Sequence, residues 1–160
     1  MTAANKSTPL TLPSDREIRM SRIFDAPRDM VFKTMTDPTA VPHWWGPRSL
    51  TTVVETMDVR PGGSWRFVQN DANGGTYVFH GEYREVTPPE RVVNTFEFDG
   101  FPGHVVVETL TLEDLGARTR VTMTSLFEST EDRDGMLHSG METGAVESWD
   151  RLEELLARQA

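Results

Sequence analysis

Three polar residues occupy positions that could carry chemistry. Asn94, His104 and Glu108 each alternate with apolar residues, so each is expected on the inward face of a β-strand. Burying an amide without a partner costs about 2–7 kcal/mol, and burying a charge costs more. These side chains therefore pair inside the protein, lie at the rim of a cavity, or contact a ligand. His104 and Glu108 lie about 13 Å apart along one strand, so they cannot bond each other directly.

Glu108 is a candidate for acid–base chemistry. Burial in an apolar pocket raises the pKa of a carboxyl group, because it disfavours the charged form. A carboxyl group tuned in this way can act as a base near neutral pH. No nucleophile motif accompanies it, since the chain has no Gly-x-Ser-x-Gly sequence and no cysteine. We therefore assign no catalytic residue and leave open whether the protein is an enzyme.

No metal or cofactor site is predicted. The four histidines, at positions 43, 80, 104 and 138, show no metal-ligand spacing, and no cysteine is available to complete a site. Pro61-Gly62-Gly63 and Asn73-Gly74-Gly75 lack the Lys-Ser/Thr pair of a phosphate-binding loop, and no helix follows either of them directly. These two sequences are interpreted as turns.

The charge balance excludes some classes of partner. The chain has 16 Lys and Arg residues against 25 Asp and Glu, a net charge of −9. Such a surface repels phosphate backbones, so we expect no nucleic-acid binding. No apolar run reaches the ~18 residues of a membrane span, and the first residues do not resemble a secretory signal. We expect a cytoplasmic protein without a membrane span, either a monomer or a homodimer.

The first part of the chain is predicted to form a tail, one strand and two short helices. Residues 1–15 show little periodicity and are predicted to form a flexible N-terminal tail, followed by a single domain over residues 16–160. Glu17–Phe24 alternates apolar and polar residues, as a strand does, with an apparent break near its end. Two short helices are predicted next, the first ending near Thr36 and the second beginning at Asp37.

The rest of the chain predicts a sheet and one long helix. From Ser129 onward, apolar residues recur every three or four positions, which predicts a long amphipathic helix with Ser129 at its cap. Short turns join the preceding strands, so they should pair antiparallel. A curved antiparallel sheet of about seven strands wrapped around a C-terminal helix is an α+β fold. The strands expected after Glu17–Phe24 are Thr51–Met57, Ser64–Gln69, Thr76–Val86, Arg91–Phe98, His104–Leu112 and Arg118–Phe127.

Several motifs together resemble one family. The chain is similar to the bacterial Activator of Hsp90 ATPase homologue 1-like (AHSA1-like) proteins, within the START/Bet v 1-like (SRPBCC, polyketide cyclase) superfamily. The resemblance implies a helix-grip fold with a hydrophobic cavity between the sheet and the C-terminal helix. The motifs that carry it are Phe24-Asp25-Ala26-Pro27, Trp44-Trp45-Gly46-Pro47, the segment from Asp58 to Trp65, Phe79-His80-Gly81-Glu82-Tyr83, Pro88-Pro89-Glu90-Arg91, and the segment from Gly140 to Leu156.

The resemblance also frames the function. It implies binding of a small hydrophobic molecule in that cavity, which is the hypothesis that we favour. Two alternatives stay open: a cyclase- or hydrolase-type enzyme that uses Glu108 or His104 as acid or base, and a stress-response module that binds Hsp90 or another protein through its acidic last helix. The predicted ligand-binding residues are Trp65, Phe67, Phe79, Tyr83, Asn94, Phe96, His104, Val106, Glu108, Met123, Phe127, Met141 and Trp149.

Overall fold

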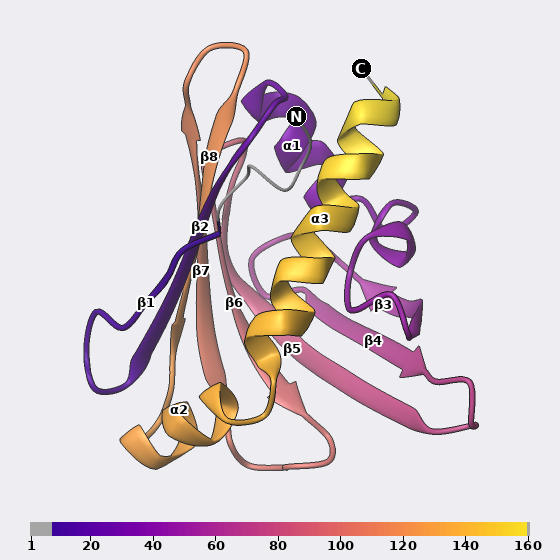
Figure 1. Ribbon diagram of the computed structural model, residues 1–160, viewed down its shortest axis with the longest axis vertical. Helices are drawn as coiled ribbons and strands as arrows, with labels where there is room; N and C mark the ends of the chain where they lie inside the picture. Colours follow the sequence, from indigo (N-terminus) through magenta and orange to yellow (C-terminus); the bar gives the residue numbers. More distant parts are fainter. Residues whose placement is uncertain (1–7, 160) are drawn as a thin grey trace.

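The computed structural model describes residues 8–159, which form one eight-stranded antiparallel sheet with a long helix against its concave side (Figure 1). The strand order is β1-β2-β8-β7-β6-β5-β4-β3. The predicted α+β helix-grip fold is confirmed. The elements are β1 (Leu10–Thr11), β2 (Glu17–Phe24), α1 (Arg28–Met35), η2 (Val41–His43), β3 (Thr51–Met57), β4 (Ser64–Asn70), β5 (Thr76–Thr87), β6 (Arg91–Phe98), β7 (Val106–Asp114), β8 (Thr119–Leu126), α2 (Thr130–Leu137) and α3 (Met141–Gln159).

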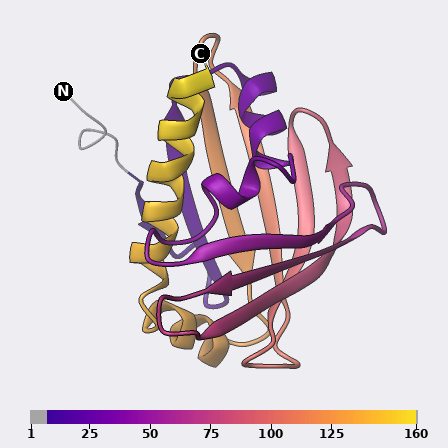
Figure 2. The same ribbon diagram turned by 90° about the vertical axis from the view of Figure 1, so that its right-hand side faces the viewer.

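The curvature of the sheet creates its concave side. Short hairpins join β3 through β8, so neighbours in the chain are neighbours in the sheet, and only β2 and β8 pair across a long separation. In Figure 2, β3 and β4 run across the direction of β7 and β8, so the sheet bends around the helix rather than lying flat beneath it. Among the described residues, no helix is long and apolar enough to span a membrane.

The N-terminal prediction needs two corrections. Residues 1–7 of the predicted flexible tail lie outside the described residues, but Leu10–Thr11 within that tail forms β1 and pairs with β2. The sheet described over residues 8–159 therefore has eight strands rather than about seven. A strand of two residues is too short to show an alternating pattern. Its position is set by pairing with β2. The second short helix is a single turn, η2, and starts later than Asp37.

The predicted last helix is divided into two. Ser129 caps α2 as expected, because its hydroxyl accepts a hydrogen bond from the backbone N–H of Asp132 at 3.0 Å. Helix α2 ends at Leu137, and α3 begins at Met141. Gly140 has a φ of +84°, a left-handed conformation that residues other than glycine rarely adopt and that separates helices. The break lets α2 turn away across the end of the sheet (Figure 1).

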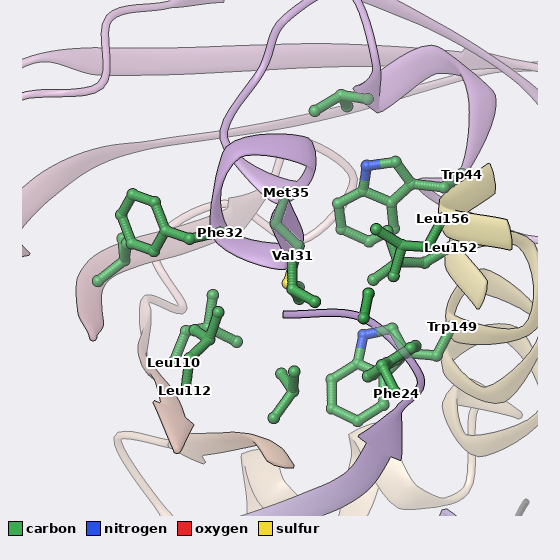
Figure 3. Close-up of a cluster of buried hydrophobic side chains, with 14 of the residues drawn as sticks. Phe24, Val31, Phe32, Met35, Trp44, Leu110, Leu112, Trp149, Leu152 and Leu156 are labelled. Atoms are coloured by element: carbon green, nitrogen blue, oxygen red, sulfur yellow. The ribbon is translucent and has the colours of Figure 1, made fainter. Parts of the chain in front are cut away.

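The main core lies where the second half of α3 meets β2 and α1. Phe24 and Leu152 have no exposed surface, and the ring of Trp149 meets that of Phe24 edge-on at 5.7 Å between centroids. Figure 3 shows Trp149 beside Phe24, with Leu152 and Leu156 next to Trp44. Buried apolar area of this kind is the main source of stability in a domain of this size.

Candidate functional site

A cavity of about 840 Å³ lies between the concave face of the sheet and the first half of α3. The thirteen residues predicted to bind a ligand all border it, and they come from β4 to β8, α3 and the segments that flank these elements. The structure therefore brings these residues, from strands, loops and helix, around one space. Their wall is completed by residues that sequence reasoning did not select, including Met20, Trp45, Gln69, Phe98, Phe101, Ser125, Asp132, Gly144 and Ser148.

Aromatic rings form one wall of the cavity. Phe79 lies between Phe96, at 5.5 Å, and Phe98, at 5.1 Å, measured between ring centroids. Trp45 meets Phe79 edge-on at 5.4 Å, so the second tryptophan of the Trp44-Trp45 pair belongs to this wall. Aromatic pairs at these separations are mutually attractive beyond their buried area. The wall is thus a preformed surface on which an apolar or flat molecule can pack.

Gly81 makes room for the indole of Trp65 in this wall. The indole N–H of Trp65 donates a hydrogen bond to the backbone carbonyl of Thr95 at 3.0 Å. A Cβ atom at position 81 would stand 2.0 Å from that carbonyl oxygen and 2.7 Å from the indole nitrogen. A side chain there would force the tryptophan out of its place, which explains why the inward face of β5 carries a glycine opposite Trp65.

A row of polar residues crosses the sheet floor of this otherwise apolar cavity. Tyr83 of β5 is the register partner of Asn94 of β6, and Asn94 is the partner of Glu108 of β7. Glu108 is in turn the partner of Ser125 of β8. Directly opposed residues on neighbouring antiparallel strands lie about 5 Å apart, and all four border the cavity. We call Asn94, Glu108 and Ser125 the polar row.

Glu108 is the acidic residue of the polar row, and its pKa is raised. Burial raises its pKa to about 7, and a hydrogen bond from Asn94 Nδ2 to Glu108 Oε1, at 3.3 Å, lowers it only in part. Among the described residues, no Lys or Arg borders the cavity to stabilise the carboxylate. The carboxyl group is therefore neutral over a wider range of pH than an exposed glutamate, with a pKa of about 7.

His104 lies at the α2 end of the cavity rather than in a strand. The prediction of a strand starting at His104 is wrong, because β7 begins at Val106. The imidazole stacks on Phe101 with 3.7 Å between ring centroids, and its Nδ1 lies 2.9 Å from a carboxylate oxygen of Asp132. Asp132 is in the first turn of α2, so the start of this helix lies beside the loop that precedes β7.

The same end of the cavity holds a possible set of metal ligands. His104, Glu128 and Asp132 each offer one ligand atom, and these atoms lie within 4.8 Å of one another. Sequence spacing could not reveal this group, because the histidine and the two acidic residues come from separate segments. In this structure Nδ1 of His104 already bonds Asp132, so a hydrogen-bonded His–Asp pair accounts for the arrangement without a metal.

The loop that carries the two tryptophans is fastened to the middle of α3. The hydroxyl of Ser148 donates to the carbonyl of Trp44 at 3.0 Å and accepts from the backbone N–H of Gly46 at 3.1 Å. The guanidinium of Arg151 donates to the carbonyl of Gly46 at 2.9 Å. These bonds hold the middle of α3 against this loop, at the boundary between the packed core and the cavity.

Comparisons with known proteins agree with this architecture. A family model described as "Activator of Hsp90 ATPase homolog 1-like protein" matches residues 25–157. A crystal structure from Rhodobacter sphaeroides is 24% identical, with a TM-score of 0.88, and the match covers 95% of this chain and 99% of that one. A protein from Chromobacterium violaceum is 26% identical, with a TM-score of 0.79, 88% coverage of this chain and 97% of that one.

A structure titled as the AHSA1 protein of Silicibacter pomeroyi is 24% identical over 90% of this chain and 99% of that chain, with a TM-score of 0.76. Among curated proteins, no sequence matches this chain at a significant level. The similarity to solved structures at this level of identity establishes the fold. The family match covers most of the chain, from the residue after β2 to near the end of α3.

Proposed function

The chain belongs to the Activator of Hsp90 ATPase homolog 1-like family, and we propose that it binds a small hydrophobic molecule in the cavity beneath the first half of α3. The observation that carries the proposal is the cavity itself. Its volume of about 840 Å³ lies within the range of small-molecule sites, which are mostly apolar and contain a few placed polar groups. An aromatic wall crossed by one polar row has that composition.

The first half of α3 supports the same proposal. Gly144 borders the cavity, and a Cβ atom built there would meet no other atom within 4 Å. The helix therefore spans open space at this point. Well-packed interiors leave few voids larger than a water molecule, so a space of this size beside a glycine favours an occupant.

Binding of the neutral dye N-phenylnaphthylamine, followed by its fluorescence, tests the proposal. The wild-type protein should bind the dye with a saturable increase in fluorescence. Phe96→Arg should abolish binding, because Phe96 contacts both Trp65 and Phe79 and a long charged side chain there replaces the apolar wall on which the neutral dye packs. Gly144→Leu should also abolish it by filling the space beneath the helix, without placing a charge in the core.

Val53→Arg is the matched control. Val53 lies on β3, does not border the cavity and is 51% exposed, so the same charge should leave dye binding unchanged. Circular dichroism of each variant separates loss of binding from loss of fold. If folded Gly144→Leu binds the dye as the wild type does, the cavity is not the binding site and the proposal fails.

A further inference from the structure

We propose that the molecule held in this cavity carries a positively charged amine, whose N–H groups bind the polar row of Asn94, Glu108 and Ser125. This inference rests on the proposed function and names the class of its ligand. Three observations carry it: the hydrogen-bonding groups that the row leaves free, the charge of the cavity lining, and the rings beside the row.

The orientation of Asn94 determines which groups are free. Its Nδ2 donates to the backbone carbonyl of Thr95 at 3.0 Å and to Glu108 Oε1 at 3.3 Å. A backbone carbonyl can only accept, so the amide nitrogen, and not the oxygen, must face Thr95. Both N–H groups of Asn94 are thus used within the protein, and the side chain has only its Oδ1 atom left to offer.

The unused atoms of the row are mostly acceptors. Within residues 8–159, no protein group hydrogen-bonds Asn94 Oδ1, Glu108 Oε2 or the hydroxyl of Ser125. An ionised Glu108 adds acceptor capacity only, whereas Ser125 can both donate and accept. When Glu108 is ionised, a ligand that supplies donors therefore satisfies this row. An ammonium group has three N–H donors and no acceptor, and its charge matches the carboxylate.

The charge of the lining favours the same ligand. Among the described residues that border the cavity, three are acidic, Glu108, Glu131 and Asp132, and none is Lys or Arg. A ligand with a carboxylate would bring a further negative charge into a low-dielectric space that already holds these three acidic groups. An amine is attracted by the same field, and the net charge of −9 adds to that attraction at a distance.

Aromatic rings flank the row. Phe96 follows Asn94 by two residues on the same face of β6, and its ring lies 5.9 Å from that of Trp65. The faces of such rings attract cations as well as apolar groups, most strongly where water is excluded. An amine bound at Glu108 would therefore direct its apolar part along the aromatic wall.

Amine binding should release a proton. Burial raises the pKa of Glu108 to about 7, so a fraction of the protein holds a neutral carboxyl group before an amine binds. Binding of an ammonium group stabilises the carboxylate, and the carboxyl proton passes to the solvent. Affinity should therefore rise between about pH 6 and pH 8 and then level off, while the amine itself stays protonated.

Other groups that face Glu108 do not explain such a profile. Asn94 and Ser125, its neighbours on β6 and β8, do not titrate, and burial raises the pKa of Tyr83 further from neutrality, with the charge of Asp58 adding to the effect. The remaining titratable groups of the lining, His104, Glu131 and Asp132, lie toward the α2 end. The α3 residues that face the cavity carry no titratable group; they are Met141, Gly144, Ala145, Ser148 and Trp149.

The experiment compares octylamine, octanol and octanoate, which share one apolar chain and differ in the head group. Each is titrated against the dye-loaded protein and, separately, by calorimetry in buffers of different ionisation enthalpy, which counts the protons released. We expect octylamine to bind at least about tenfold more tightly than octanol, and octanoate to bind most weakly. Proton release should accompany octylamine alone.

Glu108→Gln identifies the partner of the amine. It should weaken octylamine at least about tenfold, abolish the proton release, and change octanol binding by no more than about twofold. Glu113→Gln is the matched control, because it removes a carboxylate from the same strand, β7, outside the cavity, and should leave all three affinities unchanged.

The outcomes separate the two proposals. If the dye and octanol bind but octylamine binds no more tightly than octanol, the amine inference is overturned and the proposed function stands. Equal weakening of octylamine and octanol by Glu108→Gln would assign Glu108 a structural role and also overturn the inference. If neither the dye nor any of the three octyl compounds binds, the proposed function fails, and the amine inference fails with it.

Discussion

The two halves of α3 meet the rest of the protein in different ways. From the middle of the helix onward, Trp149, Leu152 and Leu156 are at most 5% exposed and belong to the main core, and of these three only Trp149 also borders the cavity. In the first half, Met141 and Gly144 face the cavity, and no residue of this half before Ser148 is buried. One helix therefore both stabilises the fold and covers a hollow space. The difference indicates that stability is concentrated at one end of the helix, which lets the other end remain open.

The two adjacent tryptophans show the same division at the level of neighbouring residues. Trp44 borders the cavity as well, but it is 5% exposed and packs in the main core near Leu152 and Leu156 (Figure 3). Trp45 is less buried and meets Phe67 edge-on at 5.1 Å in the cavity wall. The hydrogen bonds from Ser148 to this loop lie at the boundary between them. The loop thus contacts both the packed core and the cavity wall.

Leu152→Ala is expected to have the largest effect on stability. Leu152 has no exposed surface, so its truncation should lower the free energy of unfolding by about 3 kcal/mol, through lost burial and a new cavity. Met141→Ala should cost about 1 kcal/mol or less, because that side chain is only partly buried and already borders open space. Urea denaturation of both variants measures the difference. Equal losses would show that the two halves are packed alike.

Arg22→Met should have the next largest effect. Arg22 of β2 is buried and forms ion pairs with Asp150 at 2.7 Å and Glu153 at 3.4 Å, both in the second half of α3. Removal of the arginine leaves these carboxylates without their partner, at a cost of about 2–3 kcal/mol, since both acids keep some contact with water. Adding Asp150→Asn and Glu153→Gln should recover part of the loss. No recovery in the triple variant would mean that the arginine stabilises by packing alone.

Arg22 also shows how far sequence patterns reach. Glu17–Phe24 was expected to be a strand with a break near its end, yet Ile18, Met20, Arg22 and Phe24 are all buried on one face. The period-two pattern is continuous, and it looked broken because a charged residue occupies a core position. A strand is predictable from its own alternation, whereas burial of an arginine depends on acids that lie about 130 residues away in the chain.

The candidate site was predictable in the same partial way. Alternation placed Asn94 and Glu108 on inward faces, and the structure brings both to the cavity. Their contact depends on the register between β6 and β7, which alternation alone does not fix. His104 and Asp132 pair across a sequence separation of 28 residues, which neither alternation nor helical spacing relates. Sequence therefore predicts which face a residue occupies more readily than which residue it meets.

Glu108→Gln tests the hollow half through pH. Between about pH 5 and pH 7 the folded protein holds a proton on Glu108 that the unfolded chain has released, so this group lowers stability as pH rises. Glutamine mimics the neutral carboxyl group. The variant should match the wild type near pH 5 and exceed it by about 2 kcal/mol near pH 8. Urea denaturation across this range measures the difference, and a constant difference would show that Glu108 is not held neutral.

Gly144→Ala is expected to have the smallest effect on stability. The test depends on whether the variant is more or less stable than the wild type. A Cβ atom at position 144 would meet nothing within 4 Å, and alanine favours a helix over glycine by about 1 kcal/mol, so the variant should be more stable by about that amount. Gly140→Ala also meets no atom but has a φ of +84°, so it should lose about 1 kcal/mol to backbone strain. Thermal denaturation of the two variants separates the effect of open space around the new Cβ atom from the effect of backbone conformation. If Gly144→Ala destabilises the protein, the first half of α3 does not span open space, and the division of the helix into a packed half and a hollow half is wrong.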